Sequence, residues 1–107
     1  MHRQAASSSV FLAISDATRR EILDLLAGGE RSVGEIAERF SVSLPAVSQH
    51  LAVLRASRLV ERRSAGRQRL YRVRAAPLRE VSRWVKEYER FWQRKLDALG
   101  AYLDENP

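Results

Sequence analysis

The sequence predicts a single, mainly α-helical domain with a small β-hairpin, and three observations support this prediction. Two short helical segments within residues 32–54 are separated by a three-residue turn. Two short β-prone runs rich in arginine follow within residues 59–73. A long amphipathic segment spans residues 77–103. A helix-turn-helix followed by a basic hairpin is a winged helix-turn-helix, and two further helices before it give the expected order α-α-α-α-β-β-α.

The first two helices are marked by apolar spacing and by residues typical of helix ends. Residues 1–9 are short and polar, and we expect them to be flexible. Residues 10–12 belong to the first helix. Asp16 is a good N-cap for the second helix, whose apolar residues recur at helical spacing up to Leu26. Gly28, followed by another glycine, ends this helix.

The helix-turn-helix is indicated by two further caps. Ser32 and Glu35 have the spacing of a capping box at the start of the third helix. Residues 41–43 form the turn, and Ser43 caps the fourth helix. Pro45 lies in its first turn, where a missing N–H group has no cost. The buried stripe of this helix consists of Val47, Leu51 and Leu54.

The hairpin, or wing, is expected to pair residues 59–63 with residues 68–73. Residues 64–67 connect the two runs, and Gly66 can supply the positive φ that a tight turn needs. Residues 16–74 then form the helix-turn-helix core and wing of one domain that occupies residues 1–107.

The positive charge of the chain is concentrated in and beside the wing. The 107 residues carry a net charge of +6, but residues 55–74 alone hold eight arginines and one acidic residue. The other residues hold 11 basic and 12 acidic side chains. Because 17 of the 19 basic residues are arginine, one alternative is an arginine-rich solvated face. That alternative does not explain why acidic residues avoid the stretch, so we interpret it as a phosphate-binding surface.

The fourth helix is expected to read DNA, because its N-terminal end presents polar side chains and free N–H groups. Gln49 can bond adenine through two hydrogen bonds, Ser48 can bond a base or a phosphate, and Ala46 or Leu44 can contact a thymine methyl. The wing tip is expected to straddle the DNA backbone or enter the minor groove. The predicted DNA-contacting residues are Ser32, Ser43, Leu44, Ala46, Ser48, Gln49, His50, Arg55, Arg63, Arg67, Gln68 and Arg69.

The long last helix carries more apolar surface than one small domain needs. One alternative is that the helix simply covers its own domain. We favour pairing of two copies through this helix and the first helix. The predicted dimer-interface residues are Val10, Phe11, Leu12, Trp84, Val85, Tyr88, Phe91, Trp92, Leu96, Leu99 and Leu103.

The chain resembles the ArsR family of bacterial winged-helix repressors, in particular its SdpR-like branch, which does not bind metal. The resemblance covers roughly residues 10–103 and rests on DATRREIL at residues 16–23, SLPAVSQHLAVL at 43–54, LVERR at 59–63 and the following arginine-rich wing. It implies a homodimeric transcriptional repressor that binds a palindromic operator and often controls its own transcription. It also implies a bacterial cytoplasmic protein, associated with the nucleoid when bound to DNA.

Two departures from the family pattern concern metal binding and Arg58. The family's thiolate metal site would fall on Ser32 and Gly34, which cannot bind arsenite or a soft metal. The last helix has no histidine for the family's other known site. Arg58 stands where relatives usually have glycine; it is strained if the backbone there is left-handed, and it can add a phosphate contact.

These observations predict a DNA-binding regulator rather than an enzyme. The chain has no cysteine and no glycine-rich phosphate loop, and it shows no paired carboxylates or nucleophile–base set. No cofactor or metal is expected, and no residue pattern identifies an effector. The longest apolar run, residues 10–14, is too short to span a membrane, which predicts a soluble intracellular protein. The alternative function is a winged-helix module that binds a protein or RNA without reading duplex DNA.

Overall fold

The structure, a computed structural model, describes residues 9–106. The start of the chain that we expected to be flexible lies outside these residues, apart from Ser9. The described chain forms α1 (Val10–Ala13), α2 (Ala17–Ala27), β1 (Arg31–Ser32), α3 (Val33–Phe40), α4 (Leu44–Ala56), β2 (Val60–Ala65), β3 (Gln68–Val73) and α5 (Leu78–Glu105). The predicted mainly helical class with a β-hairpin is confirmed.

The predicted helix caps form as the sequence indicated. Asp16 accepts a hydrogen bond from the Arg19 N–H at 3.0 Å and begins α2. At the start of α3, Ser32 and Glu35 bond each other's backbone N–H groups at 2.8 and 3.2 Å, which completes the capping box. These bonds satisfy N–H groups that a helix start leaves without intrahelical partners. Local polar side chains therefore fix where the helices of the domain begin.

The sheet has one strand more than the sequence predicted. β1 has only two residues and pairs antiparallel with β3, so that the strand order is β1-β3-β2. The β2–β3 hairpin runs from the pair Val60–Val73 to the pair Ala65–Gln68. Its loop is therefore Gly66-Arg67, two residues shorter than the four-residue connection we expected.

The core lies between the helices and one face of the sheet. Ile22 and Leu26 of α2, Ile36 of α3, and Leu51 and Leu54 of α4 are at most 2 % exposed. Val60 and Tyr71, which lie on the face of the hairpin that packs against these helices, are also buried. The buried stripe predicted for α4 is confirmed in full by Val47, Leu51 and Leu54.

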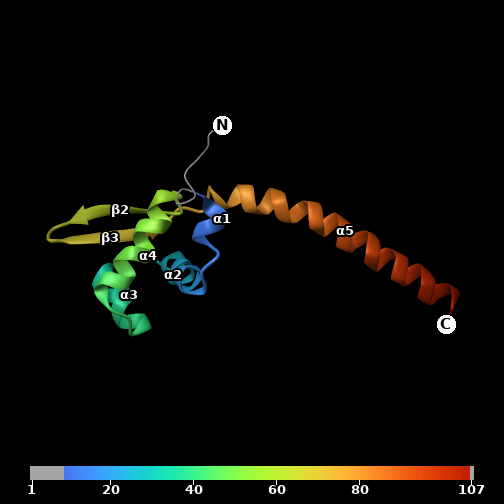
Figure 1. Ribbon diagram of the computed structural model, residues 1–107, viewed down its shortest axis with the longest axis horizontal. Helices are drawn as coiled ribbons and strands as arrows, with labels where there is room; N and C mark the ends of the chain where they lie inside the picture. Colours follow the sequence, from blue (N-terminus) through green and yellow to red (C-terminus); the bar gives the residue numbers. More distant parts are fainter. Residues whose placement is uncertain (1–8, 107) are drawn as a thin grey trace.

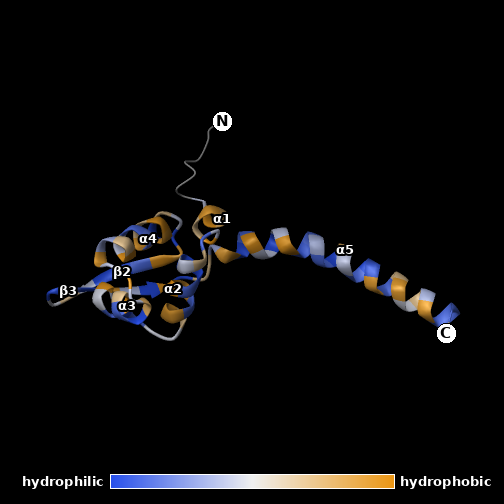
Figure 2. Cartoon of the chain, turned by 60° about the horizontal axis from the view of Figure 1, so that its bottom comes forward, coloured by the Kyte–Doolittle hydropathy of each residue, from blue (hydrophilic) through white to orange (hydrophobic). Residues whose placement is uncertain are grey.

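Helix α5 leaves this body as a single projecting arm (Figure 1). The 28-residue helix accounts for much of the longest dimension of the chain, 67 Å. Only its first turns pack on the core, through the half-buried Leu78 and Val81. Figure 2 shows apolar positions recurring along the whole length of α5, including the part beyond the body.

Candidate nucleic-acid interface

The N-terminal half of α4 presents a row of exposed side chains. The Ser43 hydroxyl accepts a hydrogen bond from the Ala46 N–H at 3.2 Å, and Pro45 occupies the first turn. Ser43, Leu44, Ser48 and Gln49 are exposed, whereas Ala46 is partly buried. Because Pro45 has no N–H group and the Ala46 N–H already bonds Ser43, this helix start favours phosphate chiefly through the helix dipole, and the exposed side chains can reach base edges in a groove.

Two of the residues predicted to contact DNA make contacts within the body: Ser32 is buried, and His50 is partly buried. Ser32 is 7 % exposed and its hydroxyl caps α3, so it does not lie on the exposed face of α4. The His50 ring turns toward α2: its Nδ1 lies 3.3 Å from an Arg19 nitrogen and 4.0 Å from Asp16 Oδ2. Ser32 is therefore corrected to a buried capping residue, a role that its local capping-box pattern already implies, whereas the contact of His50 with α2 is one that the local sequence does not reveal.

The tip of the wing carries exposed cations on a tight turn. Gly66 has φ +64°, in the left-handed region that favours glycine, and with Arg67 it forms the two-residue loop. Arg67, Gln68 and Arg69 are all exposed. Among the described residues, neither arginine has a carboxylate within ion-pairing distance. The positive charge of the tip is therefore available to a polyanion.

The cations nearer the base of the wing are partly neutralised. Arg63 donates two hydrogen bonds of 2.9 Å to the carboxylate of Glu30, and these bonds hold the pKa of Glu30 below its ordinary value. Glu61 pairs with Arg72 and lies 3.8 Å from Arg74. Arg63 stays exposed, but its guanidinium already has a carboxylate partner and is less available to a phosphate than the arginines of the tip.

The C-terminal end of α4 adds a second group of arginines. Arg55 is exposed and lines a pocket of about 310 Å³ with Arg58, Arg62 and Arg74, together with Val60 and Glu61. Arg58 has φ +66°, so the departure from the usual glycine does impose left-handed geometry on an arginine. The N–H groups of Arg58 and Leu59 bond the carbonyls of Arg55 and Leu54 at 3.0 Å, which is a Schellman motif.

The apolar face of α5 is exposed in the single chain. Trp84, Tyr88, Phe91 and Trp92 are 44–62 % exposed, and Val85, Leu96, Leu99 and Leu103 are also exposed. This contradicts the alternative in which the helix covers its own domain. Phe11 of α1 meets Trp84 edge-on at 5.8 Å and Leu12 is exposed beside it, but Val10 is 4 % exposed within the core. Val10 is therefore corrected to a core residue.

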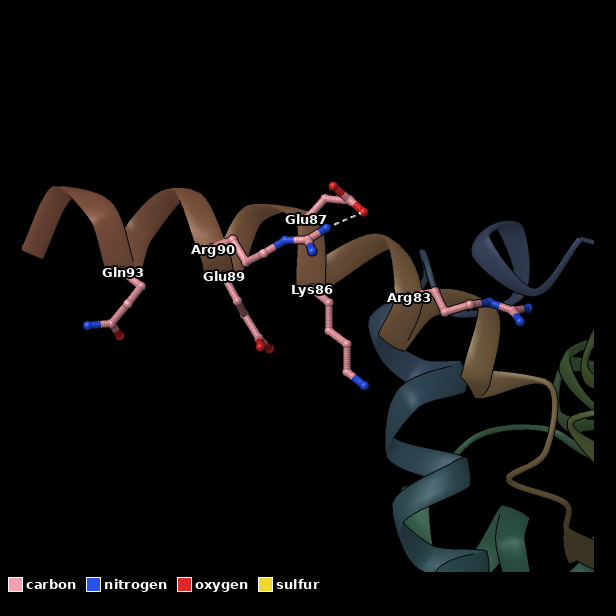
Figure 3. Close-up of a pocket in the computed structure, with 6 residues that line it drawn as sticks. All are labelled: Arg83, Lys86, Glu87, Glu89, Arg90 and Gln93. Carbon is pink, nitrogen blue, oxygen red and sulfur yellow. Dashed lines mark hydrogen bonds and ion pairs between the residues drawn. The ribbon is translucent and has the colours of Figure 1, made fainter.

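The opposite side of α5 is charged and carries no convergent site. Arg83, Lys86, Glu89 and Gln93 extend separately from the helix, and Arg90 bonds Glu87 at 2.7 Å (Figure 3). Within residues 9–106, no group of three or more histidine, aspartate and glutamate side chains is placed to hold a metal ion. None of the described helices is both long and apolar enough to cross a membrane.

Comparisons with known proteins agree with this geometry. A sequence model described as "Bacterial regulatory protein, arsR family" matches residues 16–62. The chain is 42 % identical to the HTH-type transcriptional regulator Rv2034 of Mycobacterium tuberculosis, over 86 % of this chain and 83 % of the relative. It is 38 % identical to the transcriptional repressor SdpR of Bacillus subtilis, over 76 % of this chain and 90 % of that protein. An ArsR-like transcriptional regulator from Rhodococcus sp. RHA1 superimposes with a TM-score of 0.72 and 37 % identity, over 94 % and 90 % of the two chains.

Proposed function

This chain belongs to the ArsR family of DNA-binding transcriptional regulators, and from that premise we propose that it is a homodimeric repressor that occludes a promoter at a palindromic operator. Its relatives are named as regulators and repressors rather than enzymes. The observation that carries the proposal is the combination of an exposed reading helix with a charged wing tip on one small body.

We assign base readout to the exposed first half of α4. Gln49 contacts adenine, Ser48 a base or phosphate, and Leu44 or Ala46 a thymine methyl, while Ser43 lies at the helix start. Arg67, Gln68 and Arg69 of the wing tip contact the backbone or enter the minor groove, and Arg55 contacts phosphate from the far end of α4. Recognition of bases and binding of the phosphate backbone therefore come from different parts of residues 16–74.

We assign the pairing of two copies to residues 77–103 with Phe11 and Leu12. Burying about 100 Å² of apolar surface for each large side chain stabilises the dimer by about 2.5 kcal/mol at about 25 cal/mol per Å². The exposed aromatic and leucine side chains of α5 supply several such contributions. A two-fold dimer presents its reading helices about 34 Å apart, one turn of B-DNA, which is why the operator is expected to be palindromic.

We propose that the repressor does not respond to metal. Soft metals need thiolate ligands, and the chain has no cysteine. Ser32 hydrogen-bonds Glu35 in the capping box, and Gly34 has no side chain, so the positions of the family's thiolate site hold no ligand here. Control of its own transcription, which is common in the family, makes the region upstream of its own gene the first operator to examine.

Titration of that upstream duplex at several salt concentrations tests the proposal. Each neutralised phosphate contributes about 0.9 to the slope of log K against log salt, so we expect a slope steeper than about −2. A flatter slope contradicts the proposal. Equal affinity for a random duplex of the same length would instead favour a winged-helix module that binds protein or RNA.

Replacing one cation at the wing tip sharpens this test. Arg67→Ala should weaken binding to all sequences alike and make the salt slope shallower by about 0.9, because one phosphate contact is lost. Arg83→Ala removes the same charge from the exposed polar side of α5 and should leave the slope unchanged (Figure 3). Equal losses in the two variants would mean that net charge alone, rather than the wing tip, sets the affinity.

A further inference from the structure

We propose that Arg19 is a positioning residue for DNA readout, because it ties the reading helix α4 to α1 at the edge of the proposed dimer face. The inference rests on the proposed function, since it takes α4 as the reading helix and α1 with α5 as the pairing surface. The contact of Arg19 with His50 lies within one chain, so it can be measured whether or not DNA is present.

One guanidinium joins three helices. Arg19 belongs to α2, and its Nε donates a hydrogen bond to the Ala13 carbonyl at 2.7 Å. One terminal nitrogen donates to the Leu12 carbonyl at 3.1 Å, and the other lies 3.3 Å from His50 Nδ1 on α4. The rigid, planar fork of arginine can hold several acceptors in fixed directions at once. The Arg19 guanidinium therefore contacts both the end of α1 and the middle of α4, and we refer to it as the anchor.

The α1 end of this anchor belongs to the surface that we assign to pairing. Phe11 packs edge-on against Trp84 at 5.8 Å, and Trp84 meets Tyr88 at 5.2 Å along α5. Arg19 bonds the carbonyls of the two residues that follow Phe11 in the chain. The Arg19 guanidinium is therefore bonded to the backbone of the same short helix that contributes Phe11 to the pairing surface.

The α4 end of the anchor fixes both the histidine and its tautomer. Arginine can only donate hydrogen bonds, so Nδ1 of His50 must accept and the proton of the neutral ring lies on Nε2. Asp16 Oδ2, at 4.0 Å from the same Nδ1, would favour the opposite tautomer, but it lies farther away and already accepts the Arg19 N–H at 3.0 Å. His50 directly follows the exposed Gln49, so holding its ring also holds the rotation of α4 that presents Gln49.

Arg20 provides a matched control on the same helix. Its guanidinium donates to the Ile14 carbonyl at 2.8 Å, so it also binds backbone that follows α1. Among the described hydrogen bonds, it makes none to α4. Arg19→Lys and Arg20→Lys both keep the charge and remove the fork, but only the first removes a contact with the reading helix.

The experiment combines ¹⁵N spectra of the His50 ring with DNA affinity and unfolding midpoints. In spectra of the neutral ring of the wild type, we expect Nδ1 to resonate as an unprotonated nitrogen. Arg19→Lys should give a mixture of tautomers and lower the affinity for the upstream duplex about tenfold, as for loss of a charge-assisted hydrogen bond. Arg20→Lys should leave both readouts unchanged, even if the two variants lower the unfolding midpoint equally.

A double-variant cycle separates positioning from general stabilisation. In a His50→Ala background, Arg19→Lys should cost no further affinity, because its partner on α4 is gone. Additive losses, or equal effects of Arg19→Lys and Arg20→Lys on the His50 spectra and on affinity, would overturn the inference. A wild-type protein that binds no duplex, but whose His50 tautomer depends on Arg19, would overturn the proposed function instead.

Discussion

The body of the molecule and α5 use the same kinds of apolar side chain in opposite ways. Residues 10–73 bury twelve apolar side chains against one another, whereas no residue of α5 is buried. Both regions show helical apolar spacing in the sequence, so spacing does not distinguish a core from an interface. What distinguishes them is whether the same chain supplies a second surface. In the body, the helices and the sheet of one chain pack their apolar side chains against one another. The apolar side chains of α5 have such a packing partner only if another copy of the chain provides it.

The strongest test of this comparison is the same substitution in both regions. Leu51→Ala empties a site that is 1 % exposed, and we expect it to lower the free energy of unfolding by about 2–5 kcal/mol at every protein concentration. Leu99→Ala truncates a side chain that is 53 % exposed in the single chain. We expect it to weaken the dimer by about 2 kcal/mol per copy and to leave the body folded.

Urea unfolding at two protein concentrations a hundredfold apart distinguishes the two losses, and sedimentation measures the dimer directly. The unfolding midpoint of Leu99→Ala should depend more steeply on protein concentration than the wild-type midpoint does, in the range where the variant dimer dissociates. The stability lost in Leu51→Ala should be the same at both protein concentrations. If Leu99→Ala costs the same at both concentrations and the wild type sediments as a monomer, α5 is not a pairing surface and the comparison fails.

A substitution in the reading helix should affect DNA alone. Gln49→Ala is expected to cost about 1–3 kcal/mol of affinity at one base position and to relax specificity there, because a bidentate contact with adenine is lost. The dimer dissociation constant should match that of the wild type, since Gln49 is exposed and belongs to α4 rather than to α1 or α5, the helices that we assign to pairing. Binding to a panel of single-base operator variants measures the effect. A uniform loss across the panel would mean that Gln49 does not face a base.

The elements that the sequence predicted well are those with local causes. Asp16, Ser32 and Ser43 cap helices through bonds to N–H groups three residues away, and such patterns are visible in the sequence itself. Strand β1 was missed because its two residues are a strand only through pairing with β3, some 40 residues later. The long-range partner, rather than the local pattern, defines such an element.

The candidate site divides in the same way. The exposed row of α4 and the charged wing tip follow from helical spacing and from the hairpin turn, and both were predicted. The ion pair of Arg63 with Glu30 and the contact of His50 with Arg19 each join residues more than 30 positions apart. No local sequence pattern predicts such contacts. Val10 was misplaced because the run of residues 10–14 is apolar throughout and does not show which face of α1 turns inward.

Arg58 offers a smaller effect that is confined to the body. Its left-handed backbone is costly for a residue with a side chain, so Arg58→Gly should raise the free energy of unfolding by about 0.5–1 kcal/mol at every protein concentration. Arg58→Ala removes the same side chain but keeps the strain and should not stabilise. Thermal or urea unfolding compares the two variants. If Arg58→Ala raised the free energy of unfolding as much as Arg58→Gly, relief of charge repulsion beside Arg55 and Arg62 would control this position rather than backbone geometry.

The smallest effect concerns the ion pair that joins the wing to the segment before β1. Hydrogen bonds from Arg63 lower the pKa of Glu30, so the pair stabilises the fold above the ordinary pKa of a glutamate, and this stabilisation is lost as pH falls through the lowered value. The same hydrogen bonds raise the pKa of Arg63, and the stabilisation that this gives is lost only at strongly alkaline pH, as the pH rises through the raised value. Arg63→Gln should therefore lower stability at pH 6 and cost progressively less below about pH 4.5. The Arg63 side chain is 56 % exposed and the Glu30 side chain 26 %, so solvent screens the pair; the difference should be small and should shrink in high salt. Arg90→Gln, which breaks the more exposed pair with Glu87 on α5, is the control and should change stability less at pH 6. If the cost of Arg63→Gln stayed constant down to pH 3, the Glu30 carboxylate would not be its partner, and the wing would be held to the body without this ion pair, by the sheet and by the buried Val60 and Tyr71.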